Sequence, residues 1–301
     1  MEKDNLVAIS RERGTGQLSR REVLSGIGAT VAGAAFLPAT TVEALMQQTP
    51  GPQGIQLFNG TDLSGFYTYL TEHGRNNDPN RVFRVDDGML HITGQDNGAI
   101  VSEADYENYR LVVEYKFGDR MWPPREGQAL DNGLLVHCGK EAGVNFGQFP
   151  RSIQFQIYQG AVGDMVLLPG NEHLSAMVEG EERPGGFQYV PGAAEESRVA
   201  GGSVPFNITT HFEKDPEWQN VTGFHSPNDA TNPHGEWNTM EVIAEADTLT
   251  CSINGKVVNK ATNLRISGDG TTESPHTKGA IGFQSEGGEI YFRRVELLPL
   301  G

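Results

Sequence analysis

Short segments in which apolar and polar residues alternate recur along most of this chain, and they limit its fold more than any other feature. In residues 110–117 every second side chain is apolar and falls on one face, because successive side chains of a strand point to opposite sides. The dipeptide Asn254-Gly255 separates two such segments and is a strong signal for a two-residue hairpin turn. No segment beyond the N-terminal region keeps a helical period over three turns. The pattern predicts an all-β fold, a sandwich of two antiparallel sheets.

Two long stretches lack this alternation. Residues 169–205 are rich in Gly, Pro and Glu, and residues 215–235 are rich in Asn, Pro and His. Loops of this length inside a compact domain are usually functional or disordered. Because both stretches contain aromatic residues, we expect them to be ordered loops at one rim of the sandwich.

The N-terminal segment has the features of an export signal. Residues 19–24 (SRREVL) form a twin-arginine pattern, a weakly apolar run spans residues 26–37, and Val42-Glu43-Ala44 offers the small residues that a signal peptidase needs. A solvated basic pair ahead of an ordinary buried helix is the alternative, but Gly and Pro make this run a poor helix. We therefore expect export to the periplasm or secretion, with a mature chain that begins near Leu45.

The expected organisation is a twin-arginine signal peptide over residues 1–44, a linker over residues 45–54 and one domain over residues 55–301. A domain of this length can bury a sizeable core without disulfides. No segment after the signal reaches the ~18 continuous apolar residues of a membrane span, so no transmembrane span is expected.

The net charge disfavours two classes of partner, and the cysteine content limits the disulfide bonds. The net charge of −16 disfavours nucleic acid and anionic membrane surfaces as partners. The only two cysteines, Cys138 and Cys251, lie on apolar-alternating segments, so we expect buried free thiols, with a single bridge as the alternative.

Residues 153–158 combine an apolar face with a polar face of a distinctive kind. Ile and Phe at the odd positions alternate with Gln154, Gln156 and Tyr158. A planar amide offers both donors and acceptors, so this row beside Arg151 suits a surface that binds the hydroxyls of a sugar ring. A solvated sheet face with chance Gln usage is the alternative.

Five blocks of the sequence form an ordered series. They are residues 57–66 (LFNGTDLSGF), residues 122–139, residues 151–164, residues 236–239 (EWNT) and residues 281–290 (IGFQSEGGEI). Together they resemble, in order, the blocks of the 3-keto-disaccharide hydrolase domain family, from about residue 55 to the C-terminus. That resemblance implies a concanavalin-like, jelly-roll sandwich, in agreement with the strand pattern.

The resemblance also implies cleavage of 3-keto-glycosides or 3-keto-disaccharides. A ketone at C3 acidifies the C2 proton, so a base can remove it and eliminate the C1 substituent, after which water adds back. The site needs a base, stabilisation of the enolate oxygen and a proton donor for the leaving group. We expect His137 to be the base, because imidazole titrates near neutral pH and the pattern places it on the polar face of its strand. A structural, hydrogen-bonding histidine is the alternative. The other expected catalytic residues are Arg151, Asp131 and Glu114.

Substrate recognition is expected from the amides and from further residues of the same blocks. The expected substrate-binding residues are Arg125, Asn132, Gln154, Gln156, Trp122, Gln284 and Glu286. Whether Trp122 stacks on a sugar or packs in the core stays open. The family often has Glu where this chain has Gln154, which weakens any acid–base role at that position.

Cofactors and partners follow from the same chemistry. The chain has eight histidines but no His-x-His or His-Glu-x-x-His spacing, so no dedicated zinc site is expected. A hard divalent cation with Asp164 as a ligand is an open alternative, since it would supply a Lewis acid for the ketone. The expected partners are an oxidised oligosaccharide or glycoside and an upstream sugar oxidoreductase.

Two rival functions remain. A non-catalytic, lectin-like carbohydrate-binding module would use the same amide face without a base. An ordinary glucanase would need two carboxylates about 5–5.5 Å apart, commonly from a Glu-x-Asp-x-x-Glu string. That string is absent, because Glu103-Ala104-Asp105 is followed by Glu107 and not by Glu at position 108.

Overall fold

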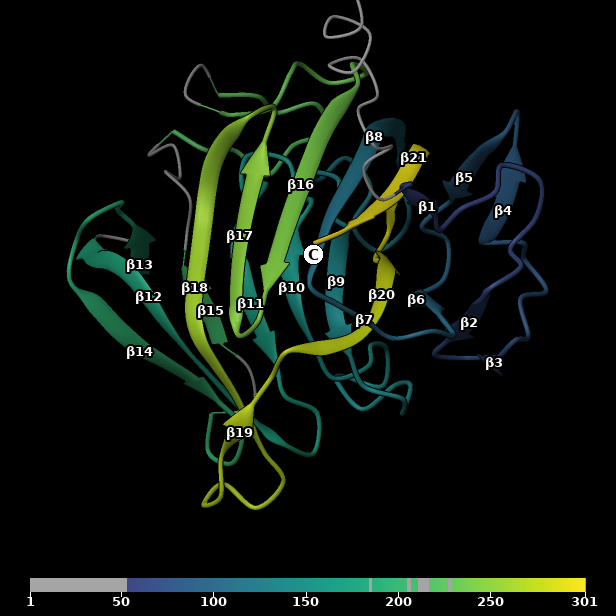
Figure 1. Cartoon of the computed structure of the whole chain (residues 1–301). Helices are drawn as coiled ribbons and strands as arrows, with labels where there is room; N and C mark the ends of the chain where they lie inside the picture. The colour runs from purple at the N-terminus through teal and green to yellow at the C-terminus, as the bar shows by residue number, and fades with distance from the viewer. Residues whose placement is uncertain (1–52, 184–185, 205–206, 211–216, 227–228, 301) are drawn as a thin grey trace, which may run out of the picture. The chain divides into compact units, whose positions relative to one another are not determined.

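The computed structural model describes residues 53–300, apart from residues 184–185, 205–206, 211–216 and 227–228. These described residues form strands and loops without a helix, and the strands pair in two antiparallel sheets (Figure 1). The predicted all-β sandwich is therefore confirmed. No helix long and apolar enough to cross a membrane occurs in this part of the chain. The expected signal peptide lies outside the described residues.

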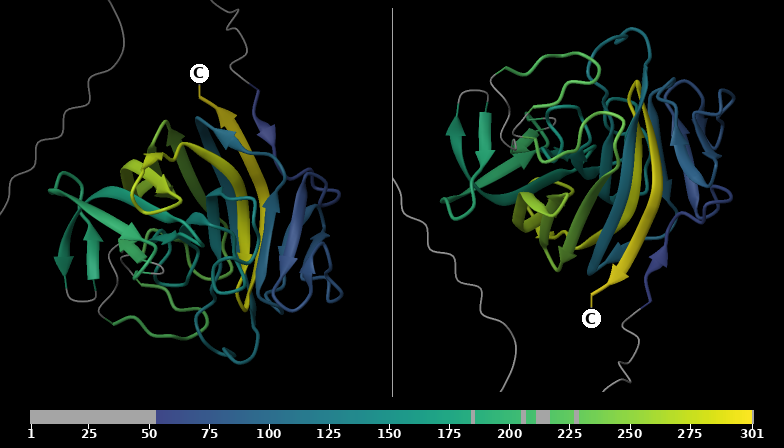
Figure 2. Two further views of the ribbon diagram at one scale, coloured as in Figure 1. Left: turned by 90° about the horizontal axis from the view of Figure 1, so that it is seen from below. Right: turned by 90° about the horizontal axis from the view of Figure 1, so that it is seen from above.

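The larger sheet has the strand order β13-β12-β18-β17-β16-β8-β21-β5-β4, and β1, β14 and β19 pair with its members. Figure 2 shows β12, β13 and β14 at the opposite side of the domain from β4 and β5. The strands are β1 (Ile55–Gln56), β4 (Phe83–Asp86), β5 (Met89–Ile92), β8 (Tyr109–Met121), β12 (His173–Arg183), β13 (Gly186–Tyr189), β14 (Glu195–Ala200), β16 (Asn238–Glu245), β17 (Thr248–Ile253), β18 (Lys256–Ser267), β19 (Ser274–Pro275) and β21 (Gly288–Pro299).

The smaller sheet has the order β15-β11-β10-β9-β20-β6-β2-β3, and β7 pairs with β20. Its central strands β9 and β20 are far apart in the sequence, so the sheet brings the middle of the chain beside its C-terminal part. The strands are β2 (Phe66–Leu70), β3 (Gly74–Arg75), β6 (Gly98–Ser102), β7 (Tyr106–Glu107), β9 (Gly133–Cys138), β10 (Ser152–Gln156), β11 (Met165–Leu168), β15 (Asn207–Thr210) and β20 (Lys278–Ser285).

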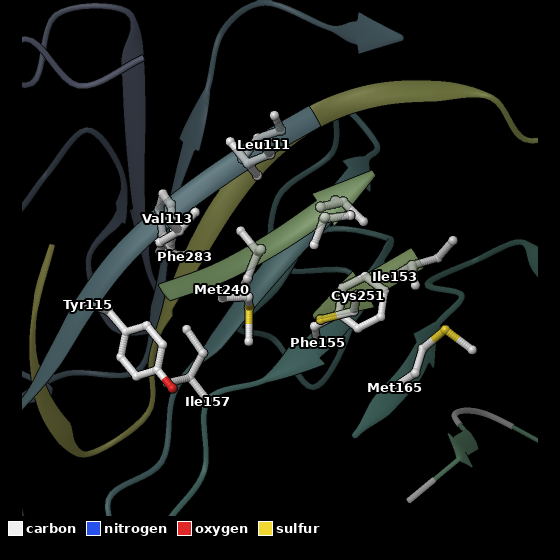
Figure 3. Packing of buried hydrophobic residues seen from close by; sticks show 14 of the residues in the cluster. Leu111, Val113, Tyr115, Ile153, Phe155, Ile157, Met165, Met240, Cys251 and Phe283 are labelled. Carbon is white, nitrogen blue, oxygen red and sulfur yellow. The ribbon is translucent and has the colours of Figure 1, made fainter. Parts of the chain in front are cut away.

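The main core fills the space between the sheets. Leu111 and Val113 of β8 face inward from the larger sheet, and Ile153 and Phe155 of β10 face inward from the smaller one (Figure 3). Each of these four side chains is at most 1% exposed. Since alternate residues point to opposite faces, the inward position of Phe155 turns its neighbours Gln154 and Gln156 to the outer face of the smaller sheet.

The structure confirms the predicted turn at residues 254–255 but not the predicted loop over residues 169–205. Asn254 and Gly255 have φ angles of 48° and 82°, as a two-residue turn with both central residues in the left-handed region requires, and they join β17 to β18. Residues 169–205, in contrast, are not a loop, because β12, β13 and β14 form within them. The Gly and Pro residues of this stretch therefore do not prevent the formation of strands.

Both cysteines are free and buried, as expected. Cys138 lies on β9 of the smaller sheet and Cys251 on β17 of the larger one. Burial raises the pKa of the Cys138 thiol to about 12 and raises that of Cys251 as well. Since the thiolate is the reactive form, neither cysteine is an activated nucleophile.

Candidate functional site

The predicted amide face lines a pocket on the outer side of the smaller sheet. Gln154 and Gln156 of β10 and Gln284 of β20 all border it, and its volume is about 360 Å³. The predicted phase of β10 is therefore confirmed, since its glutamines point away from the core. The pocket is large enough for a sugar ring with a substituent.

Three glutamine side chains are joined by hydrogen bonds along one wall of this pocket. Gln154 Nε2 donates to Gln284 Oε1 at 2.9 Å, and Gln284 Nε2 donates back to Gln154 Oε1 at 3.1 Å. Gln154 Nε2 also donates to Gln156 Oε1 at 2.5 Å. The amides meet because Gly133 on β9 has no side chain, and a Cβ there would lie 2.3 Å from Gln284 Oε1. Mutual hydrogen bonding fixes the amide planes in advance of binding.

A cluster of one cation and two carboxylates stands beside the amides. Arg125 Nη2 lies 2.9 Å from Asp131 Oδ2, and Arg125 Nη1 lies 4.0 Å from Glu286 Oε1. Glu286 borders the pocket itself. Asp131 is 8% exposed. The cluster therefore places the Glu286 carboxyl at the pocket, with Arg125 as its nearby cation and Asp131 as the buried counter-ion of Arg125.

The pKa values of the Glu286 and Asp131 carboxyls are both raised. Burial and the charge of Asp131 raise the pKa of Glu286 to about 8, while Arg125 opposes the shift. Burial also raises the pKa of Asp131 to about 6, although Arg125 lowers it. The Glu286 side chain is 30% exposed, so solvent screens part of this effect until a ligand covers the carboxyl. Two carboxyls whose pKa values are set apart by their surroundings are the arrangement that acid–base chemistry needs.

Two expected substrate-binding residues instead hold the turn that carries Glu286. Trp122 N donates to Gly287 O at 2.8 Å, and Asn132 Nδ2 donates to Gly288 O at 3.1 Å. The indole of Trp122 donates to Thr93 O at 2.8 Å and packs on Arg120, with 3.3 Å between the guanidinium carbon and the ring centroid. Both residues therefore position Glu286, and neither borders the pocket.

His137 does not lie on the polar face of its strand. The register between β9 and β20 shifts between Ala280 and Gly282, and His137 takes a φ of 51° in this bulge. Its ring is 0% exposed and lies edge-on to Tyr109 and His276, with centroid distances of 6.1 and 5.2 Å. The expectation that His137 lies on the polar face beside the amides is therefore wrong, because the alternation pattern could not reveal the bulge, and the buried ring does not border the pocket.

The buried histidine pair predicts a loss of stability in acid. Burial lowers the pKa of His137 to about 4 and lowers that of His276 further, from an ordinary value of 6.5. The unfolded chain therefore binds protons that the folded chain excludes, so stability is complete above pH 6.5 and falls as the pH drops toward 4. The His137 shift alone corresponds to about 3 kcal/mol lost by pH 4. Urea unfolding at pH 7 and pH 4 should show a smaller pH-dependent loss in His137→Leu than in the native protein, and equal losses would contradict this.

Arg151 belongs to the histidine pair and not to the amide row. Its Nη1 lies 2.9 Å from His276 Nε2, and its Nε lies 2.5 Å from Glu172 Oε2. It borders a second pocket of about 330 Å³, together with Lys140 and Glu172. The structure thus separates Arg151 from Glu286, whose nearby cation is Arg125.

Glu114 lies on the other sheet. Its strand β8 belongs to the larger sheet, and on the outer face of that sheet its carboxylate contacts Arg293 at 2.6 Å and Arg294 at 3.4 Å. These partners lower the pKa of Glu114 against the effect of partial burial. Glu114, expected to be a catalytic residue, therefore does not share a surface with the amide row of β10.

Asp164 lies in the turn between β10 and β11 and is 4% exposed. Its carbonyl accepts a hydrogen bond from Gln156 N at 2.8 Å, which ties the turn to β10. Among the described residues, no group of three or more His, Cys, Asp or Glu side chains is arranged to hold a metal ion. Asp164 has therefore no cluster of ligands around it in this part of the chain.

The family model for the 3-keto-alpha-glucoside-1,2-lyase-like domain matches residues 53–298. The chain belongs to this family. A search of curated protein sequences finds no match.

Solved structures resemble this 3-keto-alpha-glucoside-1,2-lyase-like domain at low identity. A Parabacteroides distasonis protein, provisionally assigned to the glycosyl hydrolases, is 18% identical with a TM-score of 0.43, over 82% of this chain and 94% of its own. A Bacillus subtilis carbohydrate-binding module is 11% identical with a TM-score of 0.38, over 77% and 93%. A Bacillus licheniformis β-glucanase is 10% identical with a TM-score of 0.37, over 84% and 100%. Similarity at this level concerns the sandwich fold and not the site.

Several pocket residues of this lyase-like domain were missed from the sequence. The missed lining residues are Phe146, Gln148, Phe149, Val166 and Leu168. The first three lie in the segment between β9 and β10, where no alternation indicates a direction. Val166 and Leu168 look like core residues, and only their alternation with the inward Met165 and Leu167 could have placed them on the outer face.

Proposed function

We propose that this 3-keto-alpha-glucoside-1,2-lyase-like domain cleaves glycosides whose sugar carries a ketone at C3, with Glu286 as the proton-transfer group. One observation carries the proposal: a carboxyl with a raised pKa borders an amide-lined pocket and has a cation 4.0 Å away. The amides suit hydroxyl recognition, and the carboxyl and the cation suit proton removal next to a ketone. Membership of the family supports the same chemistry.

The reaction is an elimination followed by hydration. The Glu286 carboxylate takes the C2 proton, and the electron pair of that C–H bond moves into an enolate at O3. Departure of the C1 substituent breaks the C1–O1 bond and leaves a double bond between C1 and C2. The proton on Glu286 passes to the departing oxygen, which leaves as an alcohol. Water then adds across the double bond, with oxygen at C1 and a proton at C2, to give the free 3-keto sugar.

The other members of the cluster assist this transfer. A raised pKa makes the ionised fraction of Glu286 a stronger base, so the rate should rise with pH until that carboxyl is ionised, near pH 8. Arg125 supplies positive charge where the enolate oxygen develops. Asp131 keeps Arg125 in place at 2.9 Å and raises the pKa of Glu286. Gln156, the least buried of the three amides, binds the sugar hydroxyls, and Gln154 and Gln284 hold its side chain in place.

The proposed setting is outside the cytoplasm. The twin-arginine pattern at residues 19–24 supports export of the protein. A substrate with a C3 ketone also requires a separate sugar oxidoreductase that makes it. N-terminal sequencing of protein from the native host tests the first point: a chain that begins near Leu45 supports export, and one that retains Met1 in the cytoplasm opposes it.

Incubation with a 3-keto-disaccharide and with the unoxidised parent sugar, each with and without chelator, tests the activity. The proposal predicts that only the keto form is cleaved, because only its C2 proton is acidic. Cleavage of the parent would favour a glucanase. Binding of either sugar without turnover, in the presence and absence of added divalent cations, would favour a lectin-like module. Comparison of turnover with and without chelator shows whether the activity depends on a divalent cation.

A further inference from the structure

The pocket has two chemically different ends. At one end stand Glu286 and the hydrogen-bonded glutamines, which include Gln156 and Gln284. The other end, called here the apolar end, is formed by Phe146, Phe149, Val166 and Leu168. One ligand that fills the whole pocket must therefore be polar at one end and apolar at the other.

The two ends are separated along β10. Val166 pairs with Gln154, and Leu168 pairs with Ser152 at the start of the strand. Gln156 lies four residues further on, in the direction of Asp131 and Glu286. At ~3.3 Å per residue Leu168 and Gln156 are about 13 Å apart along the strand, with Val166 beside Gln154 between them. This length is enough for a sugar ring followed by a second ring.

The loop that carries Phe146 is held in place by its neighbour Asn145. Asn145 N donates to Phe149 O at 3.0 Å, and Asn145 Nδ2 donates to Pro150 O at 2.9 Å. Asn145 Oδ1 accepts from Gly170 N at 2.8 Å, which ties the loop to the end of β11. The backbone that carries the aromatic ring is therefore held in place before a ligand binds.

Phe146 itself combines two unfavourable features. Its side chain is 58% exposed, and its φ of 55° lies in the left-handed region, where residues with a bulky side chain are rare. A strained, solvent-exposed aromatic residue at the mouth of a pocket is a feature that ligand binding explains, since a bound apolar group would cover the ring.

A second sugar is a poor occupant of the apolar end. Its hydroxyls would need hydrogen-bond partners, and beside the four apolar side chains the pocket lining offers only Gln148 and, next to Val166, Gln154, whose amide hydrogens are already used. An aromatic or other apolar group loses no hydrogen bonds there. It buries its surface against the four apolar side chains of this end.

We propose that the preferred substrates are 3-keto-glycosides with an aromatic or apolar aglycone, which occupies the apolar end while the keto sugar lies at Glu286. The inference rests on the proposed function. The aglycone leaves as an alcohol that takes up the proton from Glu286, so the reaction needs no additional co-reactant.

Benzyl and methyl 3-keto-glucosides, each as both anomers, test the inference, because their leaving alcohols have nearly equal acidity and differ mainly in the ring. The native protein should favour the benzyl compound by at least about tenfold in kcat/KM. Phe146→Ala should bring the two close to parity, and Val166→Thr should weaken the preference. Val257→Ala, an exposed truncation on β18 of the other sheet, should change neither.

Equal rates for both compounds in the native protein, or a faster reaction of a 3-keto-disaccharide, would overturn the inference and leave the proposed function intact. If no keto-glycoside is cleaved, the proposed function fails, and calorimetric binding of the same compounds still decides the inference. Tighter binding of the benzyl compound that depends on Phe146 would then support an apolar subsite. Equal binding, or none, would overturn it.

Discussion

Replacing Glu286 by Gln is expected to lower kcat/KM for a 3-keto-glucoside by about a thousandfold. The substitution keeps the size and the hydrogen-bonding capacity of the side chain and removes only its ability to accept and return a proton. Binding of the substrate should change little, because the amide row remains. Steady-state kinetics with a 3-keto-glucoside, together with calorimetric binding to the variant, measures both.

Glu126→Gln is the matched control for this substitution. Glu126 is exposed and follows Arg125 directly in the sequence, so above pH 8 its replacement removes a negative charge just as Glu286→Gln does, and it should leave turnover unchanged. In the native protein kcat/KM should rise to a plateau above about pH 8, the pKa of Glu286. A rate that falls through this range would show that Glu286 acts first as an acid. Native-like turnover by Glu286→Gln would remove it from the reaction.

Replacing Arg125 by Gln is expected to lower kcat/KM by about a hundredfold, because the enolate oxygen loses its positive charge. Arg125→Lys keeps a charge without the two-sided geometry that contacts Asp131 and Glu286, so it should retain more activity than Arg125→Gln. Kinetics with the same 3-keto-glucoside would rank the three proteins. Equal activity of Arg125→Gln and the native protein would contradict the assigned role.

The Arg125 experiment needs a control for folding, since removal of the guanidinium leaves the buried Asp131 without its partner. Breaking a buried ion pair destabilises a protein more than removing both charges does. The double variant Arg125→Gln, Asp131→Asn should therefore unfold at a higher temperature than Arg125→Gln alone. Activity that remains low in the double variant separates the loss of the enolate contact from the loss of stability.

The fold could be predicted because its signals are local. Alternation along β8 and β10 depends only on neighbouring residues, and Asn254-Gly255 specifies its own turn. The stretch over residues 169–205 was misread because its Gly and Pro residues suggest a loop, whereas long-range pairing of β12 with β18 stabilises strands there. Such long-range pairing cannot be recognised from the residues of the strand alone.

Part of the site could be predicted, because the alternation along β10 is also a local signal. The phase of β10 placed Gln154 and Gln156 correctly on one face. The placement of His137 failed because one bulge reverses the direction of a side chain, and that of Glu114 failed because alternation does not say which sheet a strand joins. The cluster of Arg125, Asp131 and Glu286 depends on a turn held by distant backbone contacts, and the residue types alone gave no reason to pair them.

The most direct test of the account follows the hydrogen at C2. A methyl 3-keto-glucoside labelled with deuterium at C2 is incubated with the native protein and with Glu286→Gln, and the label is followed by NMR against a buffer blank. The account predicts that the native protein releases sugar in which C2 has lost its deuterium, with a slower reaction than for the unlabelled compound, and that Glu286→Gln leaves the label in place. Cleavage by the native protein with the C2 deuterium retained would contradict it.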